Sequence, residues 1–465
     1  TPETRQPYSE QWNAGIQREL FKGNVLSVDY IHNSTLKISQ TLDVNHLGAA
    51  RNFNLTNAKA AITATLAGCS LTATPVASVA LAIAPGGCPG LHTSGAKSAT
   101  LSDFAGNGLD SASVYVGTNP YVYAGKTNAG AFTGNNSQLG AGAFAAPIGR
   151  SGYDALQIVY KGAMNHAWYF VQHGNIQVSY AHSRIYGTSG TGGASGGGNQ
   201  GDAFFNNPVL DNDNPMAYMG RSSLDHSNAL NFGGQVTLKY GPRIALVGHF
   251  YSAPPTSLTL DTEQTQGGIF QTDVTGDGTT GDLAPGTLPG TYMHAVNGKN
   301  LQQFITNFNG SQAGRLTPAG QQVVNSGLIS ASQMTQLGAV IQPIANLPQS
   351  LAINNPAFRN VDASFTYPIR LTRIRQGLIL EPGIAFYNAF NMSNFTNPAV
   401  RSGVLVNTVS AGGALNATNT VNNAATGVNG TNDFPTLTSA RAERGTGTFD
   451  QGSPRSTEFQ LKLNF

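Results

Sequence analysis

The stretch Leu230-Asn231-Phe232-Gly233-Gly234-Gln235-Val236-Thr237-Leu238-Lys239-Tyr240 decides the fold class of this chain. Its even-numbered positions carry apolar or aromatic residues and one glycine, whereas its odd-numbered positions carry amides, glycine, threonine and lysine. Successive side chains of a β-strand point to opposite faces, so this alternation predicts a strand with one apolar and one polar face. A soluble β-sandwich also alternates. However, a polar face of amides and an apolar face that ends in an aromatic residue are typical of a membrane-spanning β-barrel.

The same alternation recurs along the chain and predicts about nine strands. We place them near residues 9–20, 24–34, 153–162, 174–184, 227–240, 243–252, 358–367, 376–390 and 455–465. Several apolar faces end in an aromatic residue: Tyr160, Tyr180, Tyr240, Tyr367 and Phe465. The sequence therefore predicts an all-β fold, an antiparallel transmembrane β-barrel.

The connections between these strands are of two lengths. Three are short, at residues 21–23, 241–242 and 368–375, and four are long, near 36–152, 186–226, 253–357 and 391–454. Outer-membrane barrels combine short periplasmic turns with long external loops, so we expect extracellular long connections and a periplasmic C-terminus. Bacterial barrels usually have an even number of strands. Nine passes therefore indicate that residues 1–465 form the C-terminal part of a larger barrel.

Short helices are expected inside the long connections. Thr56 or Asn57 can act as the N-cap of an alanine-rich helix that stops at Gly68. Thr317 followed by Pro318 fits an N-cap and first helical position, and a further short helix is expected to start at Ser332.

Composition and charge exclude several classes of protein. The 465 residues carry 25 basic and 23 acidic side chains, and charged residues make up 10% of the chain, against about 25% in soluble domains. A net charge of +2 without a basic cluster excludes a nucleic-acid binder. No stretch approaches the ~18 apolar residues of a membrane helix. The 22 Phe and 16 Tyr exclude a wholly disordered chain.

Five stretches carry a family resemblance. They are Pro7-Tyr8-Ser9-Glu10-Gln11-Trp12-Asn13 continuing to Leu20, Val28-Asp29-Tyr30-Ile31, Pro356-Ala357-Phe358-Arg359-Asn360-Val361-Asp362, Glu381 to Phe395 with Phe386-Tyr387-Asn388-Ala389-Phe390-Asn391, and Gly452-Ser453-Pro454-Arg455 before the last strand. In their order and spacing they resemble the C-terminal barrel of TonB-dependent outer-membrane transporters, in particular the Oar-like branch. The resemblance implies an outer-membrane transporter or receptor, with a plug domain and TonB as partners. Neither a plug nor a TonB box is visible in these residues, so we expect them upstream.

The final strand places Phe459, Leu461, Leu463 and Phe465 on one face. This face would contact outer-membrane lipid near the periplasmic edge. A terminal aromatic residue on such a strand resembles the signal that the barrel-assembly machinery reads. The alternative is an ordinary last strand of a soluble β-protein.

Oxygen-bearing side chains recur at every second position at the start of the stretch from Asp273 to Asp282. Asp273, Thr275 and Asp277 would offer side-chain oxygens to a cation, Thr279 a carbonyl oxygen and Asp282 a late carboxylate. Gly278 stands at the sixth position, as in a calcium-binding EF-hand loop, but Ala284 stands where the twelfth-position Glu is expected. The stretch predicts a structural Ca²⁺ site, with an ion-free Gly/Asp-rich turn as the alternative.

Cys69 and Cys88 are the only cysteines and lie in the same long connection. Export to an oxidising compartment favours a disulfide between them over two free thiols. The bridge would close a loop of about 18 residues and stabilise the chain by about 3 kcal/mol.

The sequence contains no catalytic constellation. The nine His residues are scattered without a His-Glu-x-x-His pair, and no Gly-x-Ser-x-Gly motif occurs. We therefore expect no enzymatic activity. A TonB-dependent transporter that captures its substrate with external loops is the first hypothesis. A passive porin, or an exported structural or adhesive β-protein, is the alternative, and carbohydrate, peptide and metal chelate all stay open as substrates.

Overall fold

The computed structural model describes most of the chain. The described residues are 5–71, 75–91, 97–110, 121–123, 126–128, 130–137, 139–164, 169–188, 209–222, 225–253, 259–260, 267–291, 300–341, 357–392, 408–409 and 454–465, with residues 167, 255, 343 and 394. Much of two long connections expected from the sequence, 186–226 and 391–454, lies outside the described residues.

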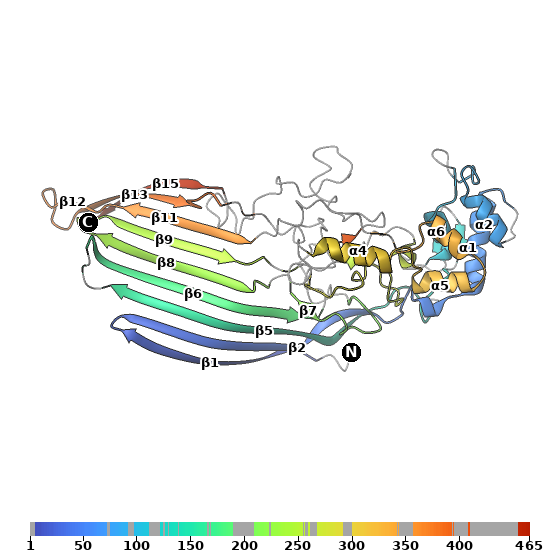
Figure 1. Ribbon diagram of the computed structural model, residues 1–465, viewed down its shortest axis with the longest axis horizontal. Coiled ribbons are helices and arrows are strands. Elements are labelled where there is room, and N and C mark those ends of the chain that lie inside the picture. Colours follow the sequence, from blue (N-terminus) through green and yellow to red (C-terminus); the bar gives the residue numbers. More distant parts are fainter. Residues whose placement is uncertain are drawn as a thin grey trace.

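One antiparallel sheet of 11 strands dominates the structure (Figure 1). Its nine long strands follow one another in sequence order: β1 (Tyr8–Phe21), β2 (Asn24–Asp43), β5 (Ala143–Met164), β6 (Val171–Gly187), β8 (Asn228–Leu238), β9 (Arg243–Tyr251), β11 (Phe358–Thr366), β13 (Ile379–Tyr387) and β15 (Ser456–Asn464). Two short strands join it, β7 (Gly220–Arg221) on β6 and β12 (Ile369–Arg370) on β13. The sheet is curved but not closed, with β1 and β15 at its two borders. The predicted antiparallel fold of about nine long strands is confirmed.

Short turns and long connections leave opposite ends of the sheet. The turns β1–β2, β5–β6 and β8–β9 lie at the end that also carries the C-terminus, and the long connections leave from the other end (Figure 1). Tyr240 and Gly241 both adopt positive φ in the β8–β9 turn, a conformation that matches the twist of a tight hairpin. At the other end, β2 and β5 continue beyond the expected boundaries to Asp43 and back to Ala143.

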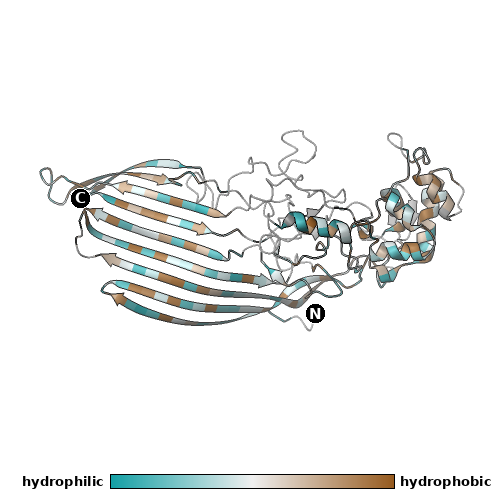
Figure 2. Ribbon diagram, in the orientation of Figure 1, coloured by the Kyte–Doolittle hydropathy of each residue, from teal (hydrophilic) through white to brown (hydrophobic). Residues whose placement is uncertain are grey.

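The strand register separates apolar from polar side chains on the two faces. Leu230 lies opposite Tyr180 and Phe250, whereas Asn231 lies opposite Ser179 and His249. Hydrophilic and hydrophobic residues alternate along each strand in Figure 2. We call these surfaces the apolar face and the polar face.

The apolar face is not covered by a second layer of the described structure. Ile16 is 76% exposed and Leu461 is 70% exposed, although both point to this face. Aromatic rings occupy the space that glycines on the facing strand leave free. A Cβ at Gly248 would lie only 2.3 Å from the Phe232 ring, so this ring packs directly on the glycine, an arrangement also used to stabilise glycines in designed sheets. Of the predicted C-terminal residues, Phe459, Leu461 and Leu463 lie on β15 and are exposed on the same face, and Phe465 follows the end of the strand and is also exposed.

Helices gather beyond the sheet, at the end of the long connections (Figure 1). They are η1 (Ala50–Asn52), α1 (Leu55–Gly68), α2 (Pro75–Ile83), α3 (Leu101–Phe104), the π-helical turn η2 (Ala105–Leu109), η4 (Gly268–Phe270), α4 (Leu301–Ser311), α5 (Pro318–Asn325) and α6 (Ala331–Gln336). Two small sheets, β3 (Tyr121–Tyr123) with β4 (Lys126–Asn128) and β10 (Thr259–Leu260) with β14 (Thr408–Val409), lie within the connections. None of the described helices is long and apolar enough to cross a membrane.

These helices, except α4, pack around one buried core, which we call the helical unit. Phe132, Phe270 and Phe104 are fully buried in it, and the Phe132 and Phe270 rings meet edge to face at 5.7 Å. Phe132 belongs to the β2–β5 connection and Phe270 to the β9–β11 connection. The core therefore fastens two connections to each other.

Local capping explains where these helices begin. Thr317 caps α5 and Pro318 is its first residue, as the sequence predicts. Helix α1 is capped by Asn54 and not by Thr56 or Asn57, because the Asn54 side chain accepts a hydrogen bond from the Asn57 N–H. Helix α6 begins after Ser330, which forms a capping box with Gln333, so the helix starts one residue before the expected Ser332.

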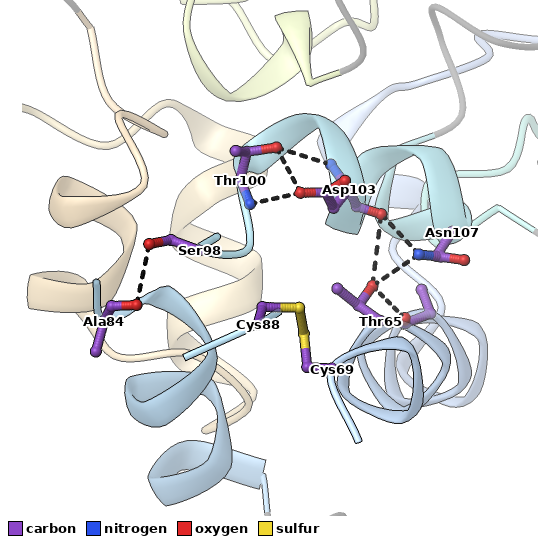
Figure 3. The surroundings of a disulfide bond; sticks show 9 residues. Thr65, Cys69, Ala84, Cys88, Ser98, Thr100, Asp103 and Asn107 are labelled. Carbon is purple, nitrogen blue, oxygen red and sulfur yellow. Dashed lines mark hydrogen bonds between the residues drawn. A yellow bond between two sulfur atoms is a disulfide. The ribbon is translucent and has the colours of Figure 1, made fainter. Parts of the chain in front are cut away.

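Cys69 and Cys88 form a disulfide inside the helical unit (Figure 3). Both cysteines are buried and join the end of α1 to the segment after α2. Asn107 donates to Thr65 Oγ1 at 3.1 Å and to the Asp103 carbonyl at 2.9 Å, which secures α1 against the α3–η2 segment beside the bridge (Figure 3).

Candidate functional site

The polar face of the sheet contains a hollow of about 660 Å³ that crosses from β2 to β9. Amide and hydroxyl side chains and one lysine line it together with the apolar side chains of Val25, Ala245 and Val247; the polar members are Lys161, Asn175, Gln177, Ser179, Asn231 and Gln235. Gly233 makes room at its centre, because a Cβ there would meet no atom closer than 3.9 Å. The amides and hydroxyls of this wall offer hydrogen bonds to a solute, and Lys161 is the one charged side chain among the lining residues.

Hydrogen bonds organise the side chains next to this hollow. The Asn231 amide oxygen lies 2.7 Å from His249 Nδ1 and accepts from the Tyr251 hydroxyl at 2.8 Å. Farther around the sheet, Tyr387 donates to Glu458 at 3.0 Å, and Arg243 contacts Glu381 at 3.3 Å. The polar face is thus neutral and amide-rich on β6 and β8, and carries carboxylates on β11, β13 and β15.

The five predicted cation ligands come together in the β9–β11 connection. Asp273, Asp277 and Asp282 are all at least 99% buried, and each can place one carboxylate oxygen within 4.8 Å of the others. Thr275 Oγ1 lies between them, 3.2, 3.1 and 3.0 Å from an oxygen of Asp273, Asp277 and Asp282 respectively. Thr279 turns its hydroxyl toward Asp277 Oδ1 at 2.6 Å.

Burial and mutual repulsion raise the proton affinity of this cluster. Burial, followed by the charges of Asp282 and Asp277, raises the pKa of Asp273 well above its usual range, although N–H groups of Gly276 and Gly278 oppose the shift. Burial, again the largest cause, raises the pKa of Asp282 to about 7. Burial near these carboxylates also raises the pKa of Tyr218 to about 12.

The donor set fits a hard cation. Ca²⁺ takes six to eight oxygen ligands, and carboxylates are its usual protein partners. One hydroxyl hydrogen of Thr275 can serve only one of the three carboxylate oxygens around it. Asp273, Asp277 and Asp282 would hold the ion, with Thr275 and Thr279 as neighbouring oxygens.

The same loop ties three long connections together. The Asn212 N–H, from the β6–β8 connection, donates to Asp277, and Asn212 Oδ1 accepts from the Asp43 N–H at 2.9 Å. The Ala50 N–H, from the β2–β5 connection, donates to the Gly276 carbonyl at 2.9 Å. We call this contact region the three-loop junction. The sequence alone does not reveal Asn212 or Asp43 as members, since neither stands in a recognisable motif.

Comparison with known proteins supports the fold. The sequence profile of the family described as "Outer membrane beta barrel domain" matches residues 1–444. No curated protein matches the chain. Among solved structures, the outer membrane transporter YddB from Escherichia coli resembles it with a TM-score of 0.34 and 7% identity, over 85% of this chain and 31% of that chain. The chain thus spans less than a third of that transporter's length.

Proposed function

The chain belongs to the outer membrane beta barrel domain family, and on that premise we propose that it forms part of the barrel of a TonB-dependent transporter of the Oar-like branch. The observation that carries the proposal is the two-sided sheet: its apolar face is exposed and its polar face is lined by amides. Lipid requires an outward apolar band, and passage of a hydrophilic solute requires a wet interior.

Geometry supports an orientation for this barrel. The long connections and the helical unit lie at one end of the sheet, and the short turns lie at the other (Figure 1). We infer that the helical unit is extracellular and captures substrate, and that the turns and the C-terminus are periplasmic. Exposed Phe459, Leu461, Leu463 and Phe465 would then serve the barrel-assembly machinery as its recognition strand.

TonB dependence is supported by the motif resemblance along the chain. The order of the stretches from Pro7 to Arg455 resembles that of the Oar-like branch, in which a plug fills the barrel. A passive porin would share the sheet but would lack a plug. An adhesive protein would use the helical unit without any passage through the sheet.

We infer a structural role for Ca²⁺ in the same protein. A bound cation would neutralise the three buried carboxylates and hold the three-loop junction in one arrangement. This arrangement would position the helical unit over the barrel opening.

Electrical recording of the natural full-length protein in planar lipid bilayers tests the transport proposal. A plugged transporter should show no steady conductance until the plug is unfolded with urea, and should then conduct. Steady ohmic conductance without urea would establish the passive porin instead. A protein that stays soluble without detergent and shows no heat-modifiable gel migration would rule out both barrels.

A further inference from the structure

A second hollow, of about 600 Å³, lies on the apolar face near the short turns. It is bounded by Lys22 of the β1–β2 turn, Tyr160 of β5, Ile176 of β6 and Val236 of β8. Ile176 and Val236 point to the apolar face, because they share it with Leu230 and Phe232. We call it the membrane-facing hollow. It shares Gly162, Ala163, Asn175 and Ile176 with the amide-lined hollow, but Tyr160, Gly174 and Val236 belong to the membrane-facing hollow and not to the other.

Two glycines create the membrane-facing hollow. Gly162 lies opposite Ile176, and Gly174 lies opposite Val236, so large side chains border positions that have none. The Tyr160 hydroxyl donates to Asn24 Oδ1 at 2.6 Å, and a Cβ at Gly162 would lie only 2.7 Å from that same oxygen. Because these two polar groups satisfy each other, the lining that they leave is mainly apolar.

A recess of this kind is filled by flexible aliphatic chains when it faces the membrane. Side chains that border an empty space lose the dispersion contacts that a neighbouring atom would provide. The acyl chains of lipids are flexible enough to adapt their shape to such a recess.

Positive charge lies at the edge of the membrane-facing hollow. Lys22 is exposed and borders it. Arg18 is exposed on the apolar face, where it lies opposite Leu26, the residue that also pairs with Tyr160. The neighbouring carboxylate of Glu19 accepts a hydrogen bond from the Gly23 N–H at 2.9 Å. No ion pair of Lys22 occurs within the described residues.

We propose that this hollow binds one anionic phospholipid of the adjacent leaflet, with an acyl chain against Gly162, Gly174 and Ile176 and the phosphate at Lys22. The apolar lining selects a lipid, and the flanking lysine selects an anionic headgroup. The site depends on the apolar face meeting the membrane. It does not depend on the transported substrate or on TonB.

Native mass spectrometry of the natural full-length protein in detergent micelles tests the site. The probes are dioleoyl-phosphatidylglycerol and dioleoyl-phosphatidylcholine at equal concentration. We expect one retained phosphatidylglycerol per protein. Ile176→Trp should fill the hollow and lower the apparent affinity about tenfold, equivalent to about 1.4 kcal/mol.

Leu246→Trp is the matched control, since Leu246 points to the same face and is 43% exposed, against 46% for Ile176. Val236→Trp fills the hollow from another strand and should reproduce the loss if Ile176→Trp does not fold. Equal retention by the hollow-filling and control variants would overturn the proposal.

The headgroup preference is tested separately. Lys22→Gln should reduce the preference for phosphatidylglycerol about fivefold, the effect of one surface lysine worth about 1 kcal/mol. Lys239→Gln, in the β8–β9 turn, should leave the preference unchanged, because Lys239 does not line the hollow. An unchanged preference in Lys22→Gln, or retention of phosphatidylcholine equal to that of phosphatidylglycerol by the unaltered protein, would refute the assignment of an anionic lipid.

Discussion

Exchanging Leu246 for arginine should destabilise the folded barrel much more than the same exchange at its neighbour Ala245. Leu246 lies opposite Gly234 and Ala363 on the apolar face, whereas Ala245 lies opposite Gln235 and Ser364 on the polar face. Both residues are in β9, so strand propensity and position along the chain are matched. The two substitutions place the same charge on opposite faces of the sheet.

The magnitude follows from the position of Leu246 in the strand. It is the fourth residue of β9, so it lies about 10 Å along the strand from Arg243 and ~8 Å above it once the strand tilt is included. An arginine costs about 2–4 kcal/mol at the midplane of an apolar band ~25 Å tall and about 0–1 kcal/mol near its edge, so at this height we expect a cost of about 2 kcal/mol. An arginine at Ala245 enters a wet interior and should change the stability by less than about 0.5 kcal/mol.

Reversible urea unfolding of the natural full-length protein in phospholipid vesicles measures both costs. Heat-modifiable gel migration reports the folded fraction at each urea concentration. Equal costs for the two variants, or a larger cost for Ala245→Arg, would falsify the assignment of the apolar face to lipid. Leu246→Gln and Ala245→Gln introduce a polar side chain without a charge. The difference in unfolding free energy between these two variants should be smaller than that between the two arginine variants.

Three further predictions concern the long connections. Replacing Cys69 and Cys88 together by serine should lower the stability of the helical unit by about 3 kcal/mol, seen as faster amide hydrogen exchange in α1 with unchanged exchange in β8; unchanged exchange in α1 would contradict it. Ca²⁺ at about 100 times its dissociation constant should stabilise the three-loop junction by about 2.7 kcal/mol, measured as slower amide hydrogen exchange around Asn212. Asp277→Asn should abolish the change in exchange on adding Ca²⁺ and on removing it with a chelator. When a chelator has removed Ca²⁺, the three-loop junction should lose stability as the pH rises from about 4 to about 7. The pKa of Asp282 is raised from 3.8 to about 7 in the folded state, so in this range the folded form holds a proton that the unfolded form has lost. Asp282→Asn should reduce this dependence of stability on pH, and a rise of stability with pH would contradict the argument.

Alternation over short distances was sufficient to predict most of the sheet. The last strand, expected at 455–465, spans Ser456–Asn464 in the structure. Alternation does not predict the outer part of β2, because the register of this strand shifts between Leu36 and Ile38, where Lys37 adopts a positive φ of 61°. Such a bulge changes which positions face the apolar side, so a strict two-residue period ends there.

The helical unit could be predicted only in part. The cap at Thr317 is a local signal that the sequence predicts, whereas the contact between Phe132 and Phe270 joins residues more than a hundred positions apart. The aspartate cluster divides in the same way. The spacing of its five oxygen-bearing residues predicts the cluster. The hydrogen bond from the Asn212 N–H to Asp277 joins it to another connection, and no local sequence pattern predicts that contact.

The construction of the helical unit from two connections sets an order for biogenesis. Its core combines residues near Phe132 with residues near Phe270, and strands β5, β6, β8 and β9 lie between them in the chain. Contacts so distant in sequence carry a higher loop-closure entropy cost than local ones, unless pairing of the intervening strands has already brought the two segments together. The Cys69–Cys88 bridge spans only 19 positions and needs no such preparation. During assembly the bridge should therefore form early. The helical core should be completed only after the β5–β6 and β8–β9 hairpins have paired.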